Sequence, residues 1–405
     1  MKHIDHWSAR IAEKSVLGLC LLASLAGVVA SKAMTLLVIL GGVSGLAALW
    51  YTNGLRPRVI TVFSVTLSLL FLWAGLSSFW SLNEIGALNL CFRLIILCLA
   101  GFFLLQTSVT TAPETREKMQ KALLVGYGLG LLALVIGYTY ANIVGDSLWG
   151  SYYFDPLTTL NNGAVIIALL LLPVASVAWR VLNPLSAIII FIAVSTGLLF
   201  FSSGASLLSI VVGLSAFILV YLFGRPAVLA IAVVSVGLIL SAPLMANKLT
   251  GSATVQELID QAPPSVKHRM LMWNFVSQKI AENPSIGLGF DSSRHIPQED
   301  FQLAPNMEIM PLHPHNAALQ IRMELGLPGV AIAAFFVFIL FWSSLKNEKS
   351  REQTALWTSV LCAYLSIGAV SYGVWQSWWI ATAWALAMIV GIAAPKTLPA
   401  SHSQD

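Results

Sequence analysis

One histidine in this sequence stands where it could perform acid–base chemistry. His315 ends a polar segment and directly precedes a long apolar run, with Asn316 after it. A neutral imidazole accepts a proton near neutral pH, so His315 is a candidate general base. Asn316 could orient that imidazole or serve as the N-cap of the following helix. His313 could bind substrate or only shape the Pro-His-Pro turn around it.

Three arginines are candidates to accompany His315 in binding an anionic substrate. Arg322 follows seven residues later, which on a helix is the same face and about 10 Å away. Arg93 lies inside an apolar run, where a guanidinium normally faces a cavity or a partner, although it could also extend to the membrane surface. Arg269 could bind substrate or be a solvated residue on the polar edge of its helix. Guanidiniums bind phosphate oxygens through paired hydrogen bonds, so their convergence would suit a diphosphate.

Other polar residues nearby favour structural roles. Glu324 falls on the opposite face of the helix from His315, which favours packing or capping over acid catalysis. The stretch from Gly287 to Gly289 lacks the preceding strand and the third glycine of a nucleotide-binding loop. The sequence shows no cluster of metal ligands, so neither a metal nor a cofactor is predicted.

The elements that must position these residues are membrane helices. The chain has 405 residues, of which 57% are hydrophobic and 10% charged, and its mean hydropathy is +0.81. Soluble domains carry roughly 25% charged residues. Long apolar runs without alternation exclude an all-β structure and predict an all-α, polytopic membrane protein with about 12 transmembrane helices. The expected spans are 15–31, 34–51, 59–80, 87–106, 121–141, 162–179, 185–201, 205–223, 226–244, 316–342, 354–374 and 376–394.

The cysteines and the N-terminus fit this interpretation. All four cysteines lie inside apolar runs, which indicates small buried hydrophobic residues and not disulfides or metal ligands; they are Cys20, Cys91, Cys98 and Cys362. The basic N-terminus and first apolar run could form a signal peptide. Because a second apolar run begins almost at once, we expect a retained first helix.

The positive charges predict the orientation of these spans. With a cytoplasmic N-terminus, the only lysine or arginine in the short outer loops is Lys32, and every cytoplasmic connection carries at least one. This is the positive-inside pattern. Both termini are therefore expected in the cytoplasm. The cytoplasmic charges are Lys2, Arg10, Lys14, Arg56, Arg58, Arg116, Lys118, Lys121, Arg180, Arg225, Lys346, Lys349, Arg351 and Lys396.

One outer segment is much longer than the others. It spans residues 245–315, between helices 1–9 (residues 1–244) and helices 10–12 with the tail (residues 316–405). The periodicity of apolar residues predicts an amphipathic helix over 265–282, capped by Ser265 and ended by Asn283-Pro284, which could lie on the membrane or roof a cavity. A second short helix is expected over 254–261.

A tryptophan group lies near an outer helix end, at Trp375, Trp378 and Trp379. Its position predicts an aromatic belt at the membrane surface, with stacking on a sugar as the alternative.

The spacing around His315 resembles a known signature. His315-Asn316 is followed by nine residues, Gly326, two residues and Gly329. This pattern resembles that of the bacterial O-antigen ligase and polymerase superfamily, whose members transfer lipid-linked glycans.

The resemblance continues upstream and in the topology. Arg269 with Trp273, followed by Asn283-Pro284 and the Gly287–Gly289 stretch, is similar to the family's arginine-containing helix and Pro/Gly turn. The family also has about twelve helices and one long, late periplasmic loop. One position departs, because Ser203 stands where many members carry an arginine. Arg322 or Arg93 could compensate, or the donor could differ.

The resemblance implies an O-antigen ligase of the bacterial inner membrane, acting in lipopolysaccharide biosynthesis on the periplasmic face. Its donor would be a glycan on undecaprenyl diphosphate, and its acceptor a sugar hydroxyl of lipid A–core or another glycan. We expect inverting, metal-independent transfer with His315 and Arg269 as catalytic residues. Arg322, Arg93, Asn316 and His313 are the expected substrate-binding residues.

Two alternatives remain from the sequence. An O-antigen or exopolysaccharide polymerase would use the same donor and the same motif. A membrane transporter would also suit twelve helices, with Arg93 as a substrate-site charge. Transporters usually show paired halves with interrupted helices, and the sequence shows no such internal symmetry.

Overall fold

The computed structural model describes residues 2–53, 62–109, 113–144, 156–201, 203–251, 257, 261–298, 302–304, 307–310, 312–345 and 350–394. Its first nine α-helices are α1 (Lys2–Val29), α2 (Ala33–Asn53), α3 (Val62–Ser77), α4 (Glu84–Val109), α5 (Pro113–Val144), α6 (Pro156–Val181), α7 (Pro184–Leu198), α8 (Gly204–Phe223) and α9 (Arg225–Gly251). The later ones are α11 (Pro264–Glu282), α12 (Ala317–Ser344), α13 (Arg351–Gly368) and α14 (Ser377–Ala393). Short elements are the 3-10 helices η1 (Ser78–Trp80), η3 (Leu199–Phe201) and η4 (Ser292–His295), with strands β1 (Gln302–Ala304) and β2 (Met307–Glu308).

The helices form the predicted all-α membrane bundle. Ten of the described helices are long and apolar enough to cross a membrane, and α14 is a shorter apolar helix. Helix α13, which packs on α8, is not among these, so the described residues hold ten candidate spans where about twelve were predicted. The antiparallel pair β1–β2 is a small addition within the long loop. The polytopic all-α prediction is therefore confirmed.

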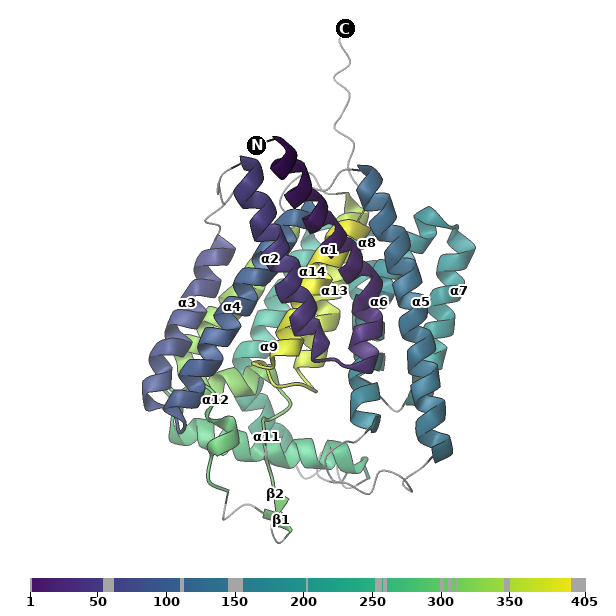
Figure 1. Cartoon of the computed structure of the whole chain (residues 1–405). Helices are drawn as coiled ribbons and strands as arrows, with labels where there is room; N and C mark the ends of the chain where they lie inside the picture. Colours follow the sequence, from purple (N-terminus) through teal and green to yellow (C-terminus); the bar gives the residue numbers. More distant parts are fainter. Residues whose placement is uncertain are drawn as a thin grey trace.

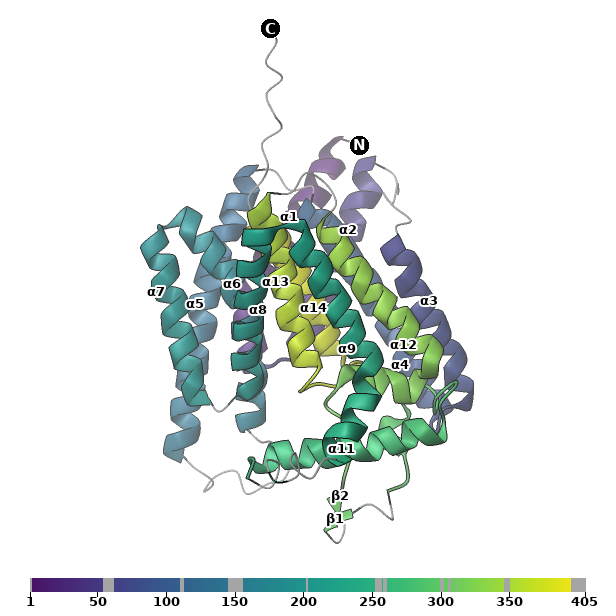
Figure 2. The same ribbon diagram turned by 180° about the vertical axis from the view of Figure 1, so that it is seen from behind.

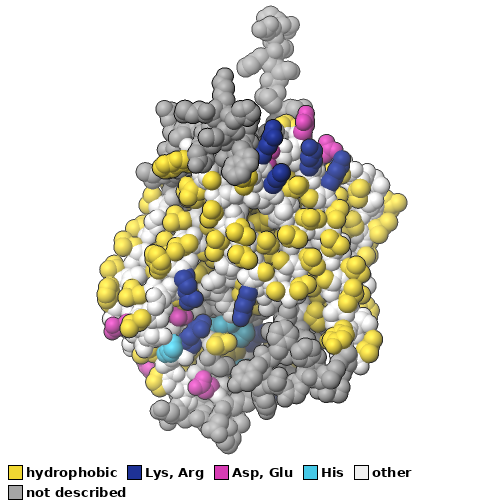
Figure 3. Space-filling model, viewed as in Figure 1, with side chains coloured by type: hydrophobic (Ala, Val, Ile, Leu, Met, Phe, Trp, Pro, Cys, Tyr) yellow, Lys and Arg dark blue, Asp and Glu magenta, His cyan; other side chains and the backbone are white. Residues whose placement is uncertain are grey.

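The two ends of the bundle differ. Helix α1 begins and α14 ends at one end, which we call the termini end, whereas α11 lies across the other, the loop end (Figures 1 and 2). On the face shown in Figure 3, lysine and arginine side chains gather near both ends, and hydrophobic side chains cover the middle. This distribution suits a bundle whose middle is solvated by lipid.

The tryptophan group lies inside the bundle, so the aromatic belt prediction is wrong. Trp375, Trp378 and Trp379 are all buried, and Trp379 stacks on Tyr364 with ring centroids 4.1 Å apart. The cause is the position of α14, which packs against α2, α4 and α6 and so has no lipid-facing side for these rings. All four cysteines are free and buried, as predicted.

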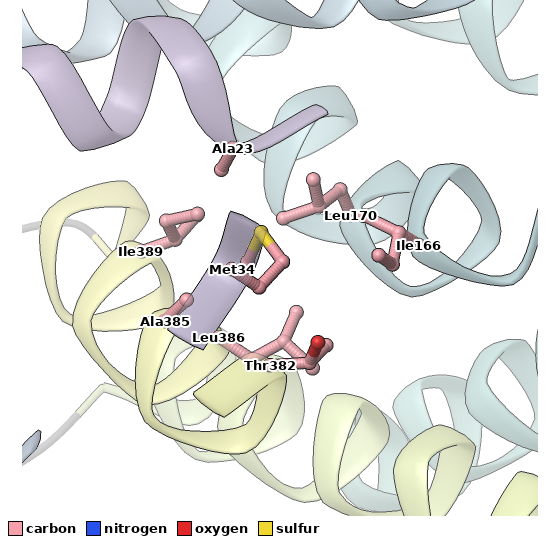
Figure 4. A pocket seen from close by; sticks show the side chains of 8 residues that line it. All are labelled: Ala23, Met34, Ile166, Leu170, Thr382, Ala385, Leu386 and Ile389. Atoms are coloured by element: carbon pink, nitrogen blue, oxygen red, sulfur yellow. The ribbon is translucent and has the colours of Figure 1, made fainter. Parts of the chain in front are cut away.

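Figure 4 shows a void in this core, between α1, α2, α6 and α14. Its volume is ≈ 10 Å³, about that of one water, and its lining is apolar except for Thr382. The Thr382 hydroxyl already donates to the Trp378 carbonyl at 2.8 Å. The void is too small for a substrate, so the site must lie elsewhere.

Helix α12, expected to be continuous, breaks at Gly326. This glycine has φ 65° and ψ −157°, a conformation that side chains rarely adopt. A Cβ there would collide with the carbonyl oxygen of Ser285. The segment after Asn283-Pro284 fills the break and satisfies the backbone groups that the break frees. These bonds run from Leu288 N to Met323 O (2.9 Å), Gly289 N to Glu324 O (2.9 Å) and Leu327 N to Ser285 O (2.9 Å). Trp73 of α3 adds a bond from Nε1 to Leu325 O (2.8 Å).

The break brings separate parts of the motif together. A Cβ on Gly287, which has φ 75°, would lie 2.6 Å from the Gly326 nitrogen. The two glycines, 39 positions apart in the sequence, therefore meet where the loop docks on α12. Their shared role is close backbone approach.

Helix α11 matches the predicted amphipathic helix but differs in detail. Its N-cap is Pro263, not Ser265, and Asn283 ends it as expected. Its buried face includes Met272, Phe275, Val276 and Ile280, and it packs on α9 and α12. The second helix expected over 254–261 falls largely outside the described residues.

The eleventh span ends earlier than predicted. Helix α13 stops at Gly368, whereas the apolar pattern favoured residue 374. Residues 369–376 form a turn at the loop end instead. This turn carries Ser371 and Gly373, and it contacts His315.

Candidate active site

His315 is fixed by a contact to the turn after α13. Its backbone has φ 53°, which is uncommon for a residue other than glycine. Its ring atom Nδ1 hydrogen-bonds the carbonyl oxygen of Ser371. Because a carbonyl only accepts, Nδ1 must carry the proton, and the lone pair lies on Nε2. The ring is thus held in the tautomer whose Nε2 can accept a proton.

The ring of His313 contacts both the backbone and the ring of His315. It is buried, and its Nδ1 accepts a hydrogen bond from the His315 backbone N–H at 3.3 Å. The two ring centroids are 4.4 Å apart. Gly373 makes room for the His313 ring, because a Cβ there would lie 2.8 Å from Cδ2. The amide nitrogen of Gln376 lies 3.2 Å from His313 Nε2.

Both rings are neutral at pH 7. Burial lowers the pKa of His315 below its usual 6.5, the Ser371 contact opposes this, and the charges of Arg269 and His268 lower the pKa further. Burial lowers the pKa of His313 to about 3, helped by the charges of His315 and Arg294. His315 is therefore in its basic form over the whole neutral range.

Helix α11 holds the histidine segment and brings Arg269 to it. Its Trp273 donates from Nε1 to the Pro314 carbonyl at 2.9 Å, and His268 Nε2 hydrogen-bonds the Ile309 carbonyl at 2.7 Å. Arg269 is half-buried on the same helix. Burial lowers the pKa of Arg269, and neighbouring Tyr372 opposes this. A guanidinium is thereby placed close enough to His315 to act on its pKa.

The other predicted site residues are less closely grouped. Asn316 is the N-cap of α12, where its Oδ1 accepts from the Leu319 N–H at 3.0 Å. Arg322 is half-buried, and its Nη1 is buried with no hydrogen-bond partner among the described residues. Arg93 is exposed on α4. His315 lies before the helix in a left-handed conformation, so the helical argument that placed Arg322 on its face does not apply.

Known proteins were compared with the chain. Residues 188–334 match the family model described as O-antigen ligase. The O-antigen ligase resemblance is confirmed. The matched region contains Arg269, His315 and the break at Gly326.

Several rickettsial proteins are similar over longer stretches. The chain is 26% identical over 328 residues to a candidate polysaccharide ligase of Rickettsia conorii, covering 78% of this chain and 76% of that protein. It is 28% identical over 332 residues to one from Rickettsia felis, covering 78% and 77%. A Rickettsia typhi relative is 35% identical over 140 residues, covering 33% and 34%. These similarities support a polysaccharide ligase-type function in a multi-pass membrane protein.

Glu324, within the region that matches the O-antigen ligase model, is a buried residue whose hydrogen bonds connect three segments. Its side chain is 0% exposed, and it ties α12 to η4 and to the turn after α13. A buried carboxylate requires such compensation. This arrangement agrees with the predicted packing role. The donors are Asp291 N (3.0 Å), Ser293 N (3.3 Å), Ser293 Oγ, Gln320 Nε2 (3.1 Å) and Trp375 Nε1 (2.6 Å).

Ser203 also lies in the region that matches the O-antigen ligase model, but it is not among the donors to Glu324. It is buried, and its hydroxyl lies 2.8 Å from that of Ser206. The position where many family members carry an arginine is thus occupied here by Ser203, whose hydroxyl contacts that of Ser206.

Two site neighbours were missed by the sequence analysis. Ser371 was placed inside a predicted span, although its Ser-Tyr-Gly run is a turn signal that would have shortened that span. Arg294 was not singled out, yet its charge lowers the pKa of His313. No local pattern marks Arg294, because only the docking of η4 brings it near the histidines.

Proposed function

We propose that this chain is an O-antigen ligase-type glycosyltransferase. It moves a glycan from undecaprenyl diphosphate to a sugar hydroxyl of lipid A–core, at the periplasmic face of the inner membrane. The observation that carries the proposal is the hydrogen bond from His315 Nδ1 to the Ser371 carbonyl, which leaves Nε2 without a partner among the described residues; Arg269 lies within electrostatic range of the ring. This pair supplies the base and the cation that transfer from a diphosphate carrier needs.

The reaction is a direct displacement. His315 Nε2 takes the proton of the acceptor hydroxyl as its oxygen attacks the anomeric carbon of the donor sugar. The new glycosidic bond forms while the bond from that carbon to the phosphate oxygen breaks. The electron pair leaves with undecaprenyl diphosphate, and the configuration inverts. The proton remains on His315 until solvent removes it.

Arg269 stabilises the charge on the departing diphosphate. Preorganised donors at the site of developing charge usually make the largest contribution to catalysis. Arg322 is a second candidate for this role, because its Nη1 is buried and has no hydrogen-bond partner in the part of the chain that the structure describes. In this scheme guanidiniums neutralise the diphosphate, so transfer proceeds without a divalent cation.

Complementation of a ligase-deficient strain tests the proposal. We expect His315→Ala and Arg269→Ala each to lower surface glycan attachment by about 100-fold or more, since bases and charge-stabilising donors contribute on that scale. The readout is lipopolysaccharide on a gel, with membrane levels of each variant measured by immunoblot. Lys279→Gln is the matched control, because Lys279 lies on the same helix and pairs with Glu282 at 3.0 Å. Normal attachment by stable His315→Ala protein would defeat the proposal.

An assay with purified protein separates the ligase from a polymerase. Carrier-linked glycan is supplied with and without lipid A–core. Product that forms only with lipid A–core is the expected result. Chain lengthening without that acceptor would identify a polymerase and overturn the ligase assignment.

A further inference from the structure

Apart from Arg269, an arginine on η4 lies beside the turn that contacts the histidines, because Ser293 and Trp375 both donate to Glu324. Arg294 extends from η4, and its Nε lies 3.4 Å from Asp291 Oδ1. Burial raises the pKa of Asp291, and the positive charges of Arg294, His295 and Arg93 act against that rise. Asp291 thus pairs with Arg294 and also lies within electrostatic range of Arg93 on α4.

The two groups of positive charge act on different rings. Arg269 and His268 lower the pKa of His315, whereas Arg294 lowers that of His313. The two ring centroids are only 4.4 Å apart, so these two sets of charges act on neighbouring rings.

The segment that carries Arg294 is fixed by buried contacts. The Asp291 backbone N–H donates to Glu324, and Asp291 itself has the left-handed conformation, with φ 57°. The Ser81 hydroxyl donates to the Phe290 carbonyl at 2.6 Å. On the other side, Asn83 Nδ2 lies 3.0 Å from His295 Nε2. The backbone under Arg294 is therefore preorganised, which lowers the entropic cost of binding.

The arginine side chains nevertheless remain accessible. The Arg294 side chain is 44% exposed and Arg93 is exposed, whereas the Asp291 side chain is only 11% exposed. The 3.4 Å separation is longer than a good N–H···O hydrogen bond, so Asp291 only partly satisfies Arg294. Because Arg93 also acts on Asp291, the positive charges around this carboxylate outnumber its single negative charge.

We propose that Arg294 and Arg93 form a second phosphate-binding subsite, which holds a phosphate group of a substrate lipid while Arg269 serves the departing diphosphate. The inference rests on the proposed function and names a further part of its site. Guanidiniums bind phosphate through paired, charge-assisted hydrogen bonds, which is the chemistry this pair offers. The phosphate belongs either to a phosphorylated glycolipid acceptor or to the carrier-linked donor.

Direct binding to the full-length protein in nanodiscs tests this subsite independently of transfer. The three probes are undecaprenyl diphosphate, lipid A–core with its phosphates, and the same lipid A–core after dephosphorylation. We expect Arg294→Gln to weaken one of the two phosphorylated probes by about tenfold, the loss of roughly one charge-assisted pair. Arg294→Lys keeps the charge and should retain most of the affinity. Binding of the dephosphorylated probe should not change.

Asp291→Asn provides a change of opposite sign. Asparagine tolerates the left-handed conformation. The backbone N–H of residue 291 can still donate its hydrogen bond to Glu324. Removing the carboxylate frees Arg294, so the same phosphorylated probe should bind about threefold more tightly. Lys32→Gln, in the exposed α1–α2 turn, is the control for loss of a positive charge and should leave binding unchanged.

The outcomes distinguish the two possible sources of the phosphate, and they distinguish failure of the subsite from failure of the proposed function. Weakening of phosphorylated lipid A–core alone assigns the subsite to the acceptor, and weakening of undecaprenyl diphosphate alone assigns it to the donor. Unchanged binding of both probes, or equal losses for the dephosphorylated probe, would overturn the subsite. Absence of transfer by the wild-type protein would instead defeat the ligase proposal and leave the binding result readable.

Discussion

The imidazole of His315 gains its chemistry from a backbone oxygen. The Ser371 carbonyl fixes the proton on Nδ1, and burial together with Arg269 and His268 keeps the ring neutral. His313, although adjacent, is buried and accepts the His315 N–H, so it acts on the position of the base. Two neighbouring histidines thus differ in role: both ring nitrogens of His313 have partners, whereas Nε2 of His315 has none among the described residues.

The rate of glycan transfer should depend on pH through His315. Its pKa is lowered, so the base form and full rate should persist below pH 6.5, and the rate should fall only as pH drops through the lowered pKa. Arg269→Gln removes one charge that lowers this pKa. The residual rate of that variant should therefore begin to fall at a higher pH than in the wild type.

Initial rates across pH 4.5–8, with saturating donor, check this shift. Lys279→Gln serves as the control and should keep the wild-type profile. An acid limb that stays in place in Arg269→Gln would mean that the arginine does not act on the base.

Among the elements, the break in α12 is the place where the segments that form the site are held together. It lets the loop after α11 insert beside Gly326, and Glu324 two residues earlier fastens η4 and the turn after α13 to the same helix. His315, Ser371 and Arg294 come from these three segments. Their relative positions therefore depend on one buried carboxylate and one glycine.

Glu324→Gln should destabilise the protein. Each carboxylate oxygen accepts at least two donors, so an amide NH₂ in either place opposes donors and leaves them unpaired. Unsatisfied buried groups cost about 1–3 kcal/mol each. We expect a clear drop in Tm of the purified protein, measured by intrinsic fluorescence in detergent.

Glu352→Gln is the matched control at the termini end. Glu352 pairs with Arg180 at 2.7 Å in a partly exposed ion pair, which contributes about 0–1 kcal/mol. Equal Tm values for Glu324→Gln and wild type would contradict the junction described here.

Gly326→Ala should be similarly harmful for a backbone reason. The residue has a positive φ, and a Cβ would collide with the Ser285 carbonyl oxygen, so the loop could not dock. We expect a loss of folded protein on size-exclusion chromatography. Gly237→Ala in α9 has open space around its Cβ position and should be neutral or slightly stabilising. A Gly326→Ala protein as stable as Gly237→Ala would contradict this account.

At the scale of the whole molecule, α11 covers one end of the bundle and the start of α1 and end of α14 lie at the other (Figure 1). The proposed chemistry is confined to the covered end. The prediction of a periplasmic site therefore requires the loop end to face the periplasm.

Cysteine labelling checks that orientation. The four natural cysteines are buried, so an introduced exposed cysteine should dominate the signal. Lys32→Cys should react with a membrane-impermeant maleimide in spheroplasts, whereas Arg351→Cys, at the start of α13, should react only after permeabilisation. The reverse pattern would place the site in the cytosol and end the proposed function.

Local patterns in the sequence are enough to predict several features of this protein. Apolar run length gave the membrane helices, periodicity gave α11, and the spacing of His315, Asn316, Gly326 and Gly329 indicated the family. These signals are local because span length, amphipathic faces and motif spacing are properties of short, continuous segments.

Which distant segments meet follows from the packing of the helices and loops. The Ser371 carbonyl lies 56 positions from His315, Glu324 joins residues up to 51 positions away, and Arg294 reaches the histidines through the docking of η4. The tryptophans of the last turn and helix changed from a predicted surface belt to a buried core for the same reason. Periodicity shows that a helix has an apolar face, but lipid and protein are equally apolar partners for it, so packing alone decides between them.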